Sequence, residues 1–168
     1  VLFAFLYTTG PYPLSYNGWG DVLVIIFFGF VPVGGTYYVQ ALTWTPDVTI
    51  ASLVCGLLID TLLVVNNYRD RKADARSGKR TVVVRFGEKF GRYFYLSLGI
   101  AASLLCLYFL FEGHIYAALL PQLYLIPHVL TWRRMLKIHS GKKLNSILGE
   151  TSRNMLLMGI LLSIGMVL

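Results

Sequence analysis

Long hydrophobic stretches alternate with short polar segments along this chain. Four stretches are long enough to cross a bilayer, at about residues 22–42, 48–65, 90–111 and 115–132. A fifth stretch, at about 155–168, is shorter, and residues 1–8 are predicted to be the tail of a further hydrophobic helix. Because roughly 20 mostly apolar residues cross the hydrocarbon core as a helix, the pattern predicts an all-α, polytopic transmembrane bundle of about five spans.

No repeat, low-complexity tract or flexible linker interrupts the chain, so residues 1–168 are interpreted as a single transmembrane domain. The chain opens inside a hydrophobic stretch, with neither an initiator Met nor a charged n-region. We therefore expect it to be the C-terminal part of a longer membrane protein.

Small residues and a proline gather within the first stretch, at Gly29, Pro32, Gly34 and Gly35. Proline removes a backbone hydrogen bond from a helix, and glycine lets a neighbouring helix approach closely. The pattern predicts a kink or a close helix contact in this span.

Charge is scarce and unevenly placed. All fifteen Lys and Arg residues lie in two segments, 69–92 and 133–153, whereas the loops at 43–47 and 112–114 carry Asp47 and Glu112. Because basic loops face the cytoplasm, both basic segments and residues 10–21 are predicted to be cytoplasmic, in a multi-pass protein of the cell membrane. Topology and anionic lipid then explain the net charge of +7, so the expected partner is the lipid bilayer and no nucleic acid.

The segment 66–81, NNYRDRKADARSGKRT, carries the candidate chemistry. It begins where the second hydrophobic stretch ends. Asn67, Asp70 and Asp74 have the spacing that places side chains on one face of a continuing helix. Such oxygen ligands suit Mg²⁺, which binds through one or two carboxylates together with substrate phosphate.

Six cations surround these acids: Arg69, Arg71, Lys72, Arg76, Lys79 and Arg80. Acids that hold Mg²⁺, flanked by Arg and Lys, would bind a diphosphate and stabilise its departure. The alternative is a helix end whose solvated charges neutralise one another.

Asp60 lies inside the second hydrophobic stretch, seven residues before Asn67 and on the same helix face. A charge at this depth is costly unless it faces a polar cavity. Asp60 is therefore interpreted either as an extension of such a cavity or as a protonated or paired structural acid.

The string NNYRDRKADARSGKRTVVVRFG resembles the second aspartate-rich motif of the UbiA-type intramembrane prenyltransferases. The closest resemblance is to the members that prenylate 1,4-dihydroxy-2-naphthoate in menaquinone biosynthesis. GPYPLSYNGWGD at 10–21, GTYYVQ at 35–40 and LNSILGETSRNMLL at 144–157 resemble further parts of the same enzymes. The resemblance spans nearly the whole chain.

The resemblance implies a nine-span fold in which two aspartate-rich motifs hold Mg²⁺ and a polyprenyl diphosphate. The prenyl group passes to an aromatic acid, which loses its carboxylate to give demethylmenaquinone. The implied metal ligands are Asn67, Asp70 and Asp74, of which Asp70 and Asp74 are also implied to be catalytic. The implied substrate-binding residues are Asn66, Arg69, Lys79, Arg80, Tyr37, Tyr38 and Gln40.

The first aspartate-rich motif of that family has no counterpart among these 168 residues. We therefore expect these residues alone to be inactive and the parent protein to be an enzyme. Two alternatives stay open: a sister prenyltransferase with another aromatic acceptor, and a non-catalytic polytopic membrane protein.

Overall fold

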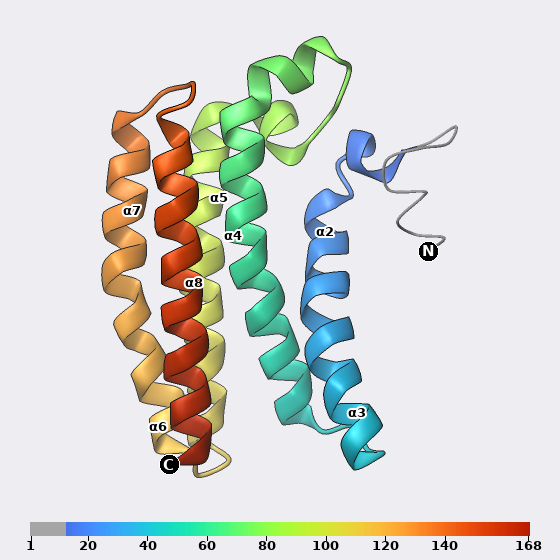
Figure 1. The fold of residues 1–168 in the computed structure, drawn as a ribbon, viewed down its shortest axis with the longest axis vertical. Coiled ribbons are helices and arrows are strands. Elements are labelled where there is room, and N and C mark those ends of the chain that lie inside the picture. Colours follow the sequence, from blue (N-terminus) through green and yellow to red (C-terminus); the bar gives the residue numbers. More distant parts are fainter. Residues whose placement is uncertain (1–12) are drawn as a thin grey trace.

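The computed structural model describes residues 13–168, and every regular element in that range is a helix. Five helical segments within it are long and apolar enough to cross a membrane: Gly20–Ala41, Pro46–Arg76, Val82–Leu110, Ile115–Lys137 and Leu144–Val167. They lie side by side as one bundle (Figure 1). The predicted all-α polytopic architecture is confirmed, while the helix tail expected at residues 1–8 lies outside the described residues.

The first span changes its helical type along its length. After the short 3₁₀ turn η1 (Leu14–Asn17), α2 (Gly20–Val24) passes directly into the π-helix η2 (Ile25–Gly34) and then into α3 (Gly35–Ala41). Pro32 lies inside η2, where the missing backbone donor already disturbs the α-helical pattern.

Glycines bring this span into backbone contact with α4 (Pro46–Arg76), as the sequence predicted. A Cβ atom added to Gly29 would lie 2.4 Å from the carbonyl oxygen of Ser52 and 2.9 Å from the Cα of Gly56. Only glycine therefore permits this helix spacing.

Helix α4 is the central and longest helix of the described chain. Thr45 caps its start by accepting a hydrogen bond from the Val48 backbone at 3.4 Å, and Pro46 occupies the first turn. The helix continues past the end of the hydrophobic stretch at Val65 to Arg76, as the motif spacing predicted, because the charged segment is rich in strong helix formers such as Arg, Lys and Ala. The candidate motif is consequently helical.

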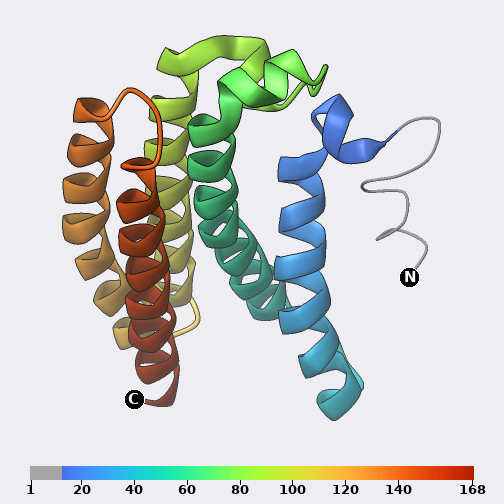
Figure 2. The same cartoon turned by 45° about the horizontal axis from the view of Figure 1, so that its top comes forward.

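The connection from α4 to α5 (Val82–Cys106) folds over the end of the bundle toward η1 (Figure 2). Gly87 has a φ of 87°, a left-handed conformation that separates the first turn of α5 from its long membrane part. Two hydrogen bonds pin the connection: the Arg80 backbone donates to the Tyr16 carbonyl, and Arg85 Nη2 to the Asn17 carbonyl, both at 2.7 Å.

The remaining spans complete the other side of the bundle. Helix α5 continues as η3 (Leu107–Leu110); α6 (Ile115–Leu119), η4 (Leu120–Tyr124) and α7 (Leu125–Lys137) form the fourth span, and α8 (Leu144–Val167) the fifth. The prediction of a short last span from residue 155 is wrong. Its polar first half is helical and turns Asn154 toward α7, where Nδ2 donates to Thr131 Oγ1 at 3.0 Å.

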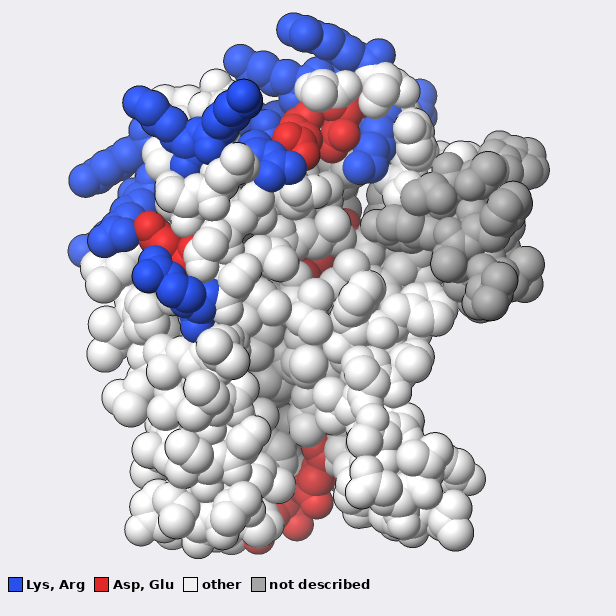
Figure 3. Space-filling view, viewed as in Figure 1, with Lys and Arg blue, Asp and Glu red and all other residues white. Residues whose placement is uncertain are grey.

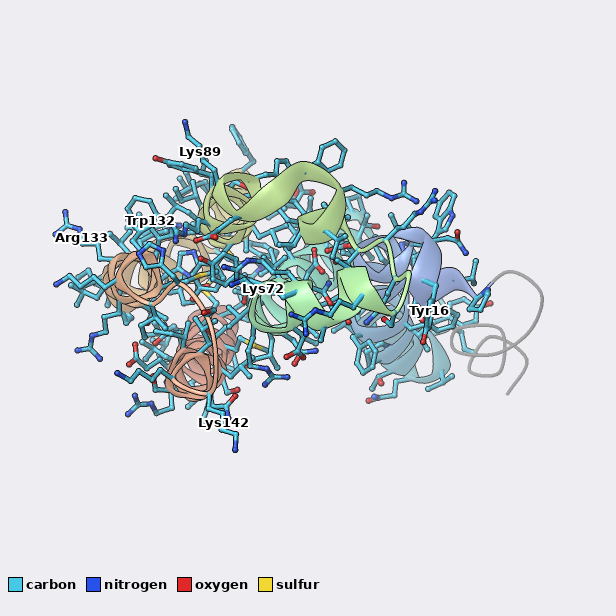
Figure 4. The ribbon with its side chains drawn as sticks, turned by 90° about the horizontal axis from the view of Figure 1, so that it is seen from above. Tyr16, Lys72, Lys89, Trp132, Arg133 and Lys142 are labelled. Atoms are coloured by element: carbon cyan, nitrogen blue, oxygen red, sulfur yellow. The ribbon has the colours of Figure 1, made fainter. Side chains whose placement is uncertain are left out.

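Both basic segments lie at the same end of the bundle. Lys and Arg atoms cover that end, and acidic atoms emerge at the opposite end (Figure 3). Seen from the basic end, Lys72 lies near the middle over α4, whereas Lys89, Arg133 and Lys142 lie toward the rim (Figure 4). The helix arrangement therefore places both basic segments on the same side of the bundle, as the charge pattern of the loops predicted.

Candidate metal and diphosphate site

Asp70 lies in the charged last part of α4 and is held by its neighbour Arg69. Arg69 donates through Nε to Asp70 Oδ1 at 2.8 Å and through Nη2 to Oδ2 at 2.6 Å. The same guanidinium donates to Asn66 Oδ1 at 2.6 Å and, through Nη1, to Asn145 Oδ1 of α8 at 3.0 Å. Arg69 thus orients the Asp70 carboxylate and ties α4 to the start of α8.

Asp74 sits one turn further along, beside the turn that ends α4. Gly78, with a φ of 78°, reverses the chain so that the Lys79 backbone donates to the Asp74 carbonyl at 2.9 Å. Lys79 Nζ lies 3.7 Å from Asp74 Oδ1. The other carboxylate oxygen, Oδ2, is buried and has no hydrogen-bond partner. A buried acceptor without a donor is the state expected of a metal ligand before its metal is present.

Asn67 faces the first span. It is 3% exposed and lines a small cavity with Asp21 of α2, Lys79 and Thr81. The three motif residues therefore come from consecutive turns of one helix but have different surroundings: Asn67 lies at the α2 interface, Asp70 beside Arg69 and Asp74 beside Lys79.

These α4 residues form a partial ligand set. Among the described residues, no group of three or more His, Cys, Asp or Glu side chains is close enough to hold a metal ion. Two carboxylates and one carboxamide are nonetheless an all-oxygen set that fits Mg²⁺, provided that phosphate and water oxygens supply the other positions.

The structure does not bring Tyr37, Tyr38 and Gln40 to the motif. They belong to α3, at the end of the bundle opposite the basic end (Figure 1). Gln40 Nε2 donates to the Thr36 carbonyl of its own helix at 3.1 Å. Arg80 is exposed near the motif end, so of these four residues it alone lies where a diphosphate bound by the motif could reach it.

Sequence analysis missed a second polar cluster at the basic end, centred on Glu88. Glu88 Oε2 accepts from Arg71 Nη2 at 2.8 Å, and Glu88 Oε1 from the Tyr68 hydroxyl at 2.9 Å and from Arg92 Nη2. His139 Nδ1, from the connection between α7 and α8, lies 3.3 Å from Glu88 Oε1. Glu88 is the one acid between Arg76 and Arg92. A single acid among several cations was the sequence feature that could have indicated this cluster.

Replacing Glu88 by Gln is expected to lower the free energy of unfolding by about 2 kcal/mol, because the change weakens hydrogen bonds made by charged groups. Arg71 and Arg92 would keep their charge with side chains only 10% and 17% exposed. Thermal denaturation in detergent, followed by helical circular dichroism, measures the effect.

Glu112→Gln is the matched control, because that exposed carboxylate accepts one hydrogen bond, from the half-buried Tyr108 at 2.8 Å. Equal destabilisation by the two changes would contradict a special role of the Glu88 cluster.

Five membrane-length helices with the charged motif at one end define an all-helical, polytopic membrane protein. The model of the UbiA prenyltransferase family matches residues 1–162. The chain belongs to this family.

Several curated relatives are named 1,4-dihydroxy-2-naphthoate octaprenyltransferase. That of Haemophilus influenzae is 32% identical over 171 residues, which cover all of this chain and 55% of the relative. That of Escherichia coli is 41% identical over 107 residues, covering 64% of this chain and 34% of the relative. The UbiA prenyltransferase domain-containing protein 1 of Mus musculus is 27% identical over 165 residues, which cover 98% of this chain and 47% of the relative. No solved structure matches the chain significantly.

The chain thus spans about half, or less, of the length of the relatives it matches.

Proposed function

We propose that this chain supplies one half of the Mg²⁺–diphosphate site of a membrane prenyltransferase. The whole protein would transfer a polyprenyl group from its diphosphate to 1,4-dihydroxy-2-naphthoate, with decarboxylation, to give demethylmenaquinone. The observation that carries the proposal is the end of α4, where Asp70 and an Asp74 with an unpartnered oxygen lie among Arg and Lys side chains. The relatives named for this reaction support the choice of acceptor.

Asn67, Asp70 and Asp74 would hold the metal, which supplies charge neutralisation for the departing diphosphate. Arg69 keeps the Asp70 carboxylate in a fixed orientation through two hydrogen bonds. Lys79, at 3.7 Å from Asp74, is close enough to steer that carboxylate and still free to donate to a phosphate oxygen. Arg80 would add a further phosphate contact.

The prenyl transfer itself conserves atoms and electrons without a redox partner, because its direct product is the hydroquinone, demethylmenaquinol; demethylmenaquinone then forms by a separate two-electron oxidation. The C–O bond to diphosphate breaks with its electron pair, and an aromatic carbon forms the new bond to the allylic carbon. The carboxylate then leaves as CO₂, returning its bonding electrons to the ring. Negative charge develops on the diphosphate as its C–O bond breaks, so cations at the end of α4 stabilise the transition state of this ionisation.

We propose that the isoprenoid chain lies along α4 on the membrane side of the motif. An apolar groove of about 840 Å³ between α4 and α8 supports this placement, with Val54, Leu58, Met155 and Met158 in its lining. The motif end would face the cytoplasm, since it carries the basic segments, and Tyr37, Tyr38 and Gln40 would contribute only to the far part of the cavity.

The test is an assay of the full-length protein in membranes, with a polyprenyl diphosphate and 1,4-dihydroxy-2-naphthoate, in the presence of Mg²⁺ or of a chelator. We expect demethylmenaquinone only with Mg²⁺. If product forms with a hydroxybenzoate or homogentisate instead, the proposed prenyl transfer stands, but 1,4-dihydroxy-2-naphthoate is rejected as the acceptor. Absence of product with every acceptor, from a protein that is folded, would reject the proposed activity.

A further inference from the structure

The guanidinium of Arg69 is largely occupied by protein oxygens. Nε and Nη2 donate to the two oxygens of Asp70, Nη2 also donates to Asn66 Oδ1, and Nη1 donates to Asn145 Oδ1 at 3.0 Å. These bonds use four of the five N–H groups of an arginine side chain. At most one N–H is left for a phosphate oxygen, so the main role of Arg69 is to hold Asp70.

The pair of Arg69 and Asp70 is not rigid on its own. Neighbouring residues of a helix do not face each other, so the two side chains must bend to meet. Their side chains are 25% and 39% exposed, and an ion pair so open to water holds no fixed geometry by itself. Asn66 belongs to the same helix, one turn earlier. A group outside α4 is needed to fix the guanidinium relative to the rest of the bundle.

Among the described residues, Asn145 is the hydrogen-bond partner of Arg69 that comes from another helix. It is the second residue of α8 and is exposed, but its neighbours are firmly packed. Leu144 and Ile147 are 0% and 1% exposed and belong to the buried cluster that includes Tyr68 of α4. The Asn145 backbone is therefore fixed beside the motif.

A second contact holds α8 at the same place. Arg71 Nη2 donates to the main-chain carbonyl of His139, in the connection between α7 and α8. This bond uses a backbone oxygen, so a substitution at Asn145 does not remove it. The carboxamide of Asn145 can therefore be changed without releasing the start of α8 from α4.

We propose that Asn145 is a positioning residue of the prenyl-transfer site, which acts through Arg69 to keep the Asp70 carboxylate oriented for Mg²⁺. A carboxylate has about four acceptor positions, so the two bonds from Arg69 leave lone pairs for a metal. The inference rests on the proposed function, because it assigns a role within the same site. It extends that site to α8, which also lines the apolar groove proposed for the isoprenoid chain.

The test compares Asn145→Leu with Asn145→Asp in the full-length protein, purified in detergent. Leu has a similar size but removes the acceptor oxygen, whereas Asp retains it. We expect Asn145→Leu to lower kcat about tenfold, as for the loss of one hydrogen bond to a charged group. The Mg²⁺ concentration for half-maximal rate should rise, with no change in the KM for 1,4-dihydroxy-2-naphthoate. Asn145→Asp should stay within about twofold of the wild-type rate, because it still accepts from Arg69.

Calorimetric titration of Mg²⁺ into the protein with inorganic diphosphate gives a readout that does not depend on turnover, and Asn145→Leu should bind more weakly. Asn154→Leu is the matched control, because the same substitution in the same helix removes the bond to Thr131 of α7. This control should lower the melting temperature but leave kcat and Mg²⁺ affinity unchanged. Asn145→Leu should show the reverse pattern.

A double-mutant cycle with Arg69→Met tests the route of the effect. If Asn145 acts through Arg69, Asn145→Leu has no further effect in the Arg69→Met protein, because its partner is already lost. Equal losses in both backgrounds, or wild-type rate and affinity in Asn145→Leu, overturn the proposal. A wild type that makes no product rejects the proposed function instead, and the Mg²⁺–diphosphate affinities of the same variants then decide the role of Asn145.

Discussion

Replacing Asp74 by Ala in the full-length protein is expected to reduce prenyl transfer by about 100-fold to 1,000-fold, the range seen when one pre-organised electrostatic contact is removed from an active site. Asp74 has a buried carboxylate oxygen without a partner, and its other oxygen lies 3.7 Å from Lys79 Nζ. Its role in the fold rests on its backbone carbonyl, which accepts from Lys79 and Ser77 and which Ala retains. The loss should therefore be one of activity and not of folding.

The measurement is the initial rate of demethylmenaquinone formation over a range of Mg²⁺ concentrations, with thermal stability as the check on folding. Asp47→Ala provides the control, since it removes an acid from the first turn of the same helix, far from the motif. Full activity of the Asp74→Ala protein would dismiss the metal site. Asp70→Ala should also lose activity, but because it releases Arg69 from two hydrogen bonds, part of its effect would come from the contact between α4 and α8.

Gly29→Ala is expected to lower the free energy of unfolding by about 3 kcal/mol, the upper part of the range for overpacking a closed interior. The added methyl group would lie 2.4 Å from the Ser52 carbonyl oxygen and 2.9 Å from the Gly56 backbone. Neither contact is with a movable side-chain end, so η2 and α4 would have to separate.

Gly35→Ala is a matched control in the same span, because nothing lies within 4 Å of a Cβ built there. Ala has the higher helix propensity, so this change should stabilise the protein by up to about 1 kcal/mol. Helical circular dichroism during thermal denaturation in detergent compares the two variants. Equal effects of the two substitutions would contradict the close contact between η2 and α4.

Much of the fold could be predicted because the relevant signals are local. A helix in lipid must satisfy its own backbone hydrogen bonds, so the apolar stretches alone locate the spans. The predictions were least accurate where a polar side chain is hidden by a neighbour. Asn154 is a case, because its bond to Thr131 of α7 lets α8 begin at Leu144, ahead of the apolar stretch.

For the candidate site, spacing along one helix correctly indicated that Asn67, Asp70 and Asp74 occur on consecutive turns of α4. It could not indicate the partner of each side chain. The roles of Tyr37, Tyr38 and Gln40 came from the family resemblance and stay predictions. Their distance from the motif follows from the direction of the first span, which starts at the basic end and carries α3 to the other (Figure 1).

By itself the sequence determined an all-helical membrane protein, the gathering of its cations at one end, and a helical motif of two acids and an amide. Each depends on hydropathy, charge or spacing within a single segment. Tertiary structure alone decided that Arg69 reaches Asn145 and that Glu88 joins Arg71 and Arg92. These contacts join residues far apart in the chain or on different helices, and only the packing of helices against one another brings them within a few ångströms.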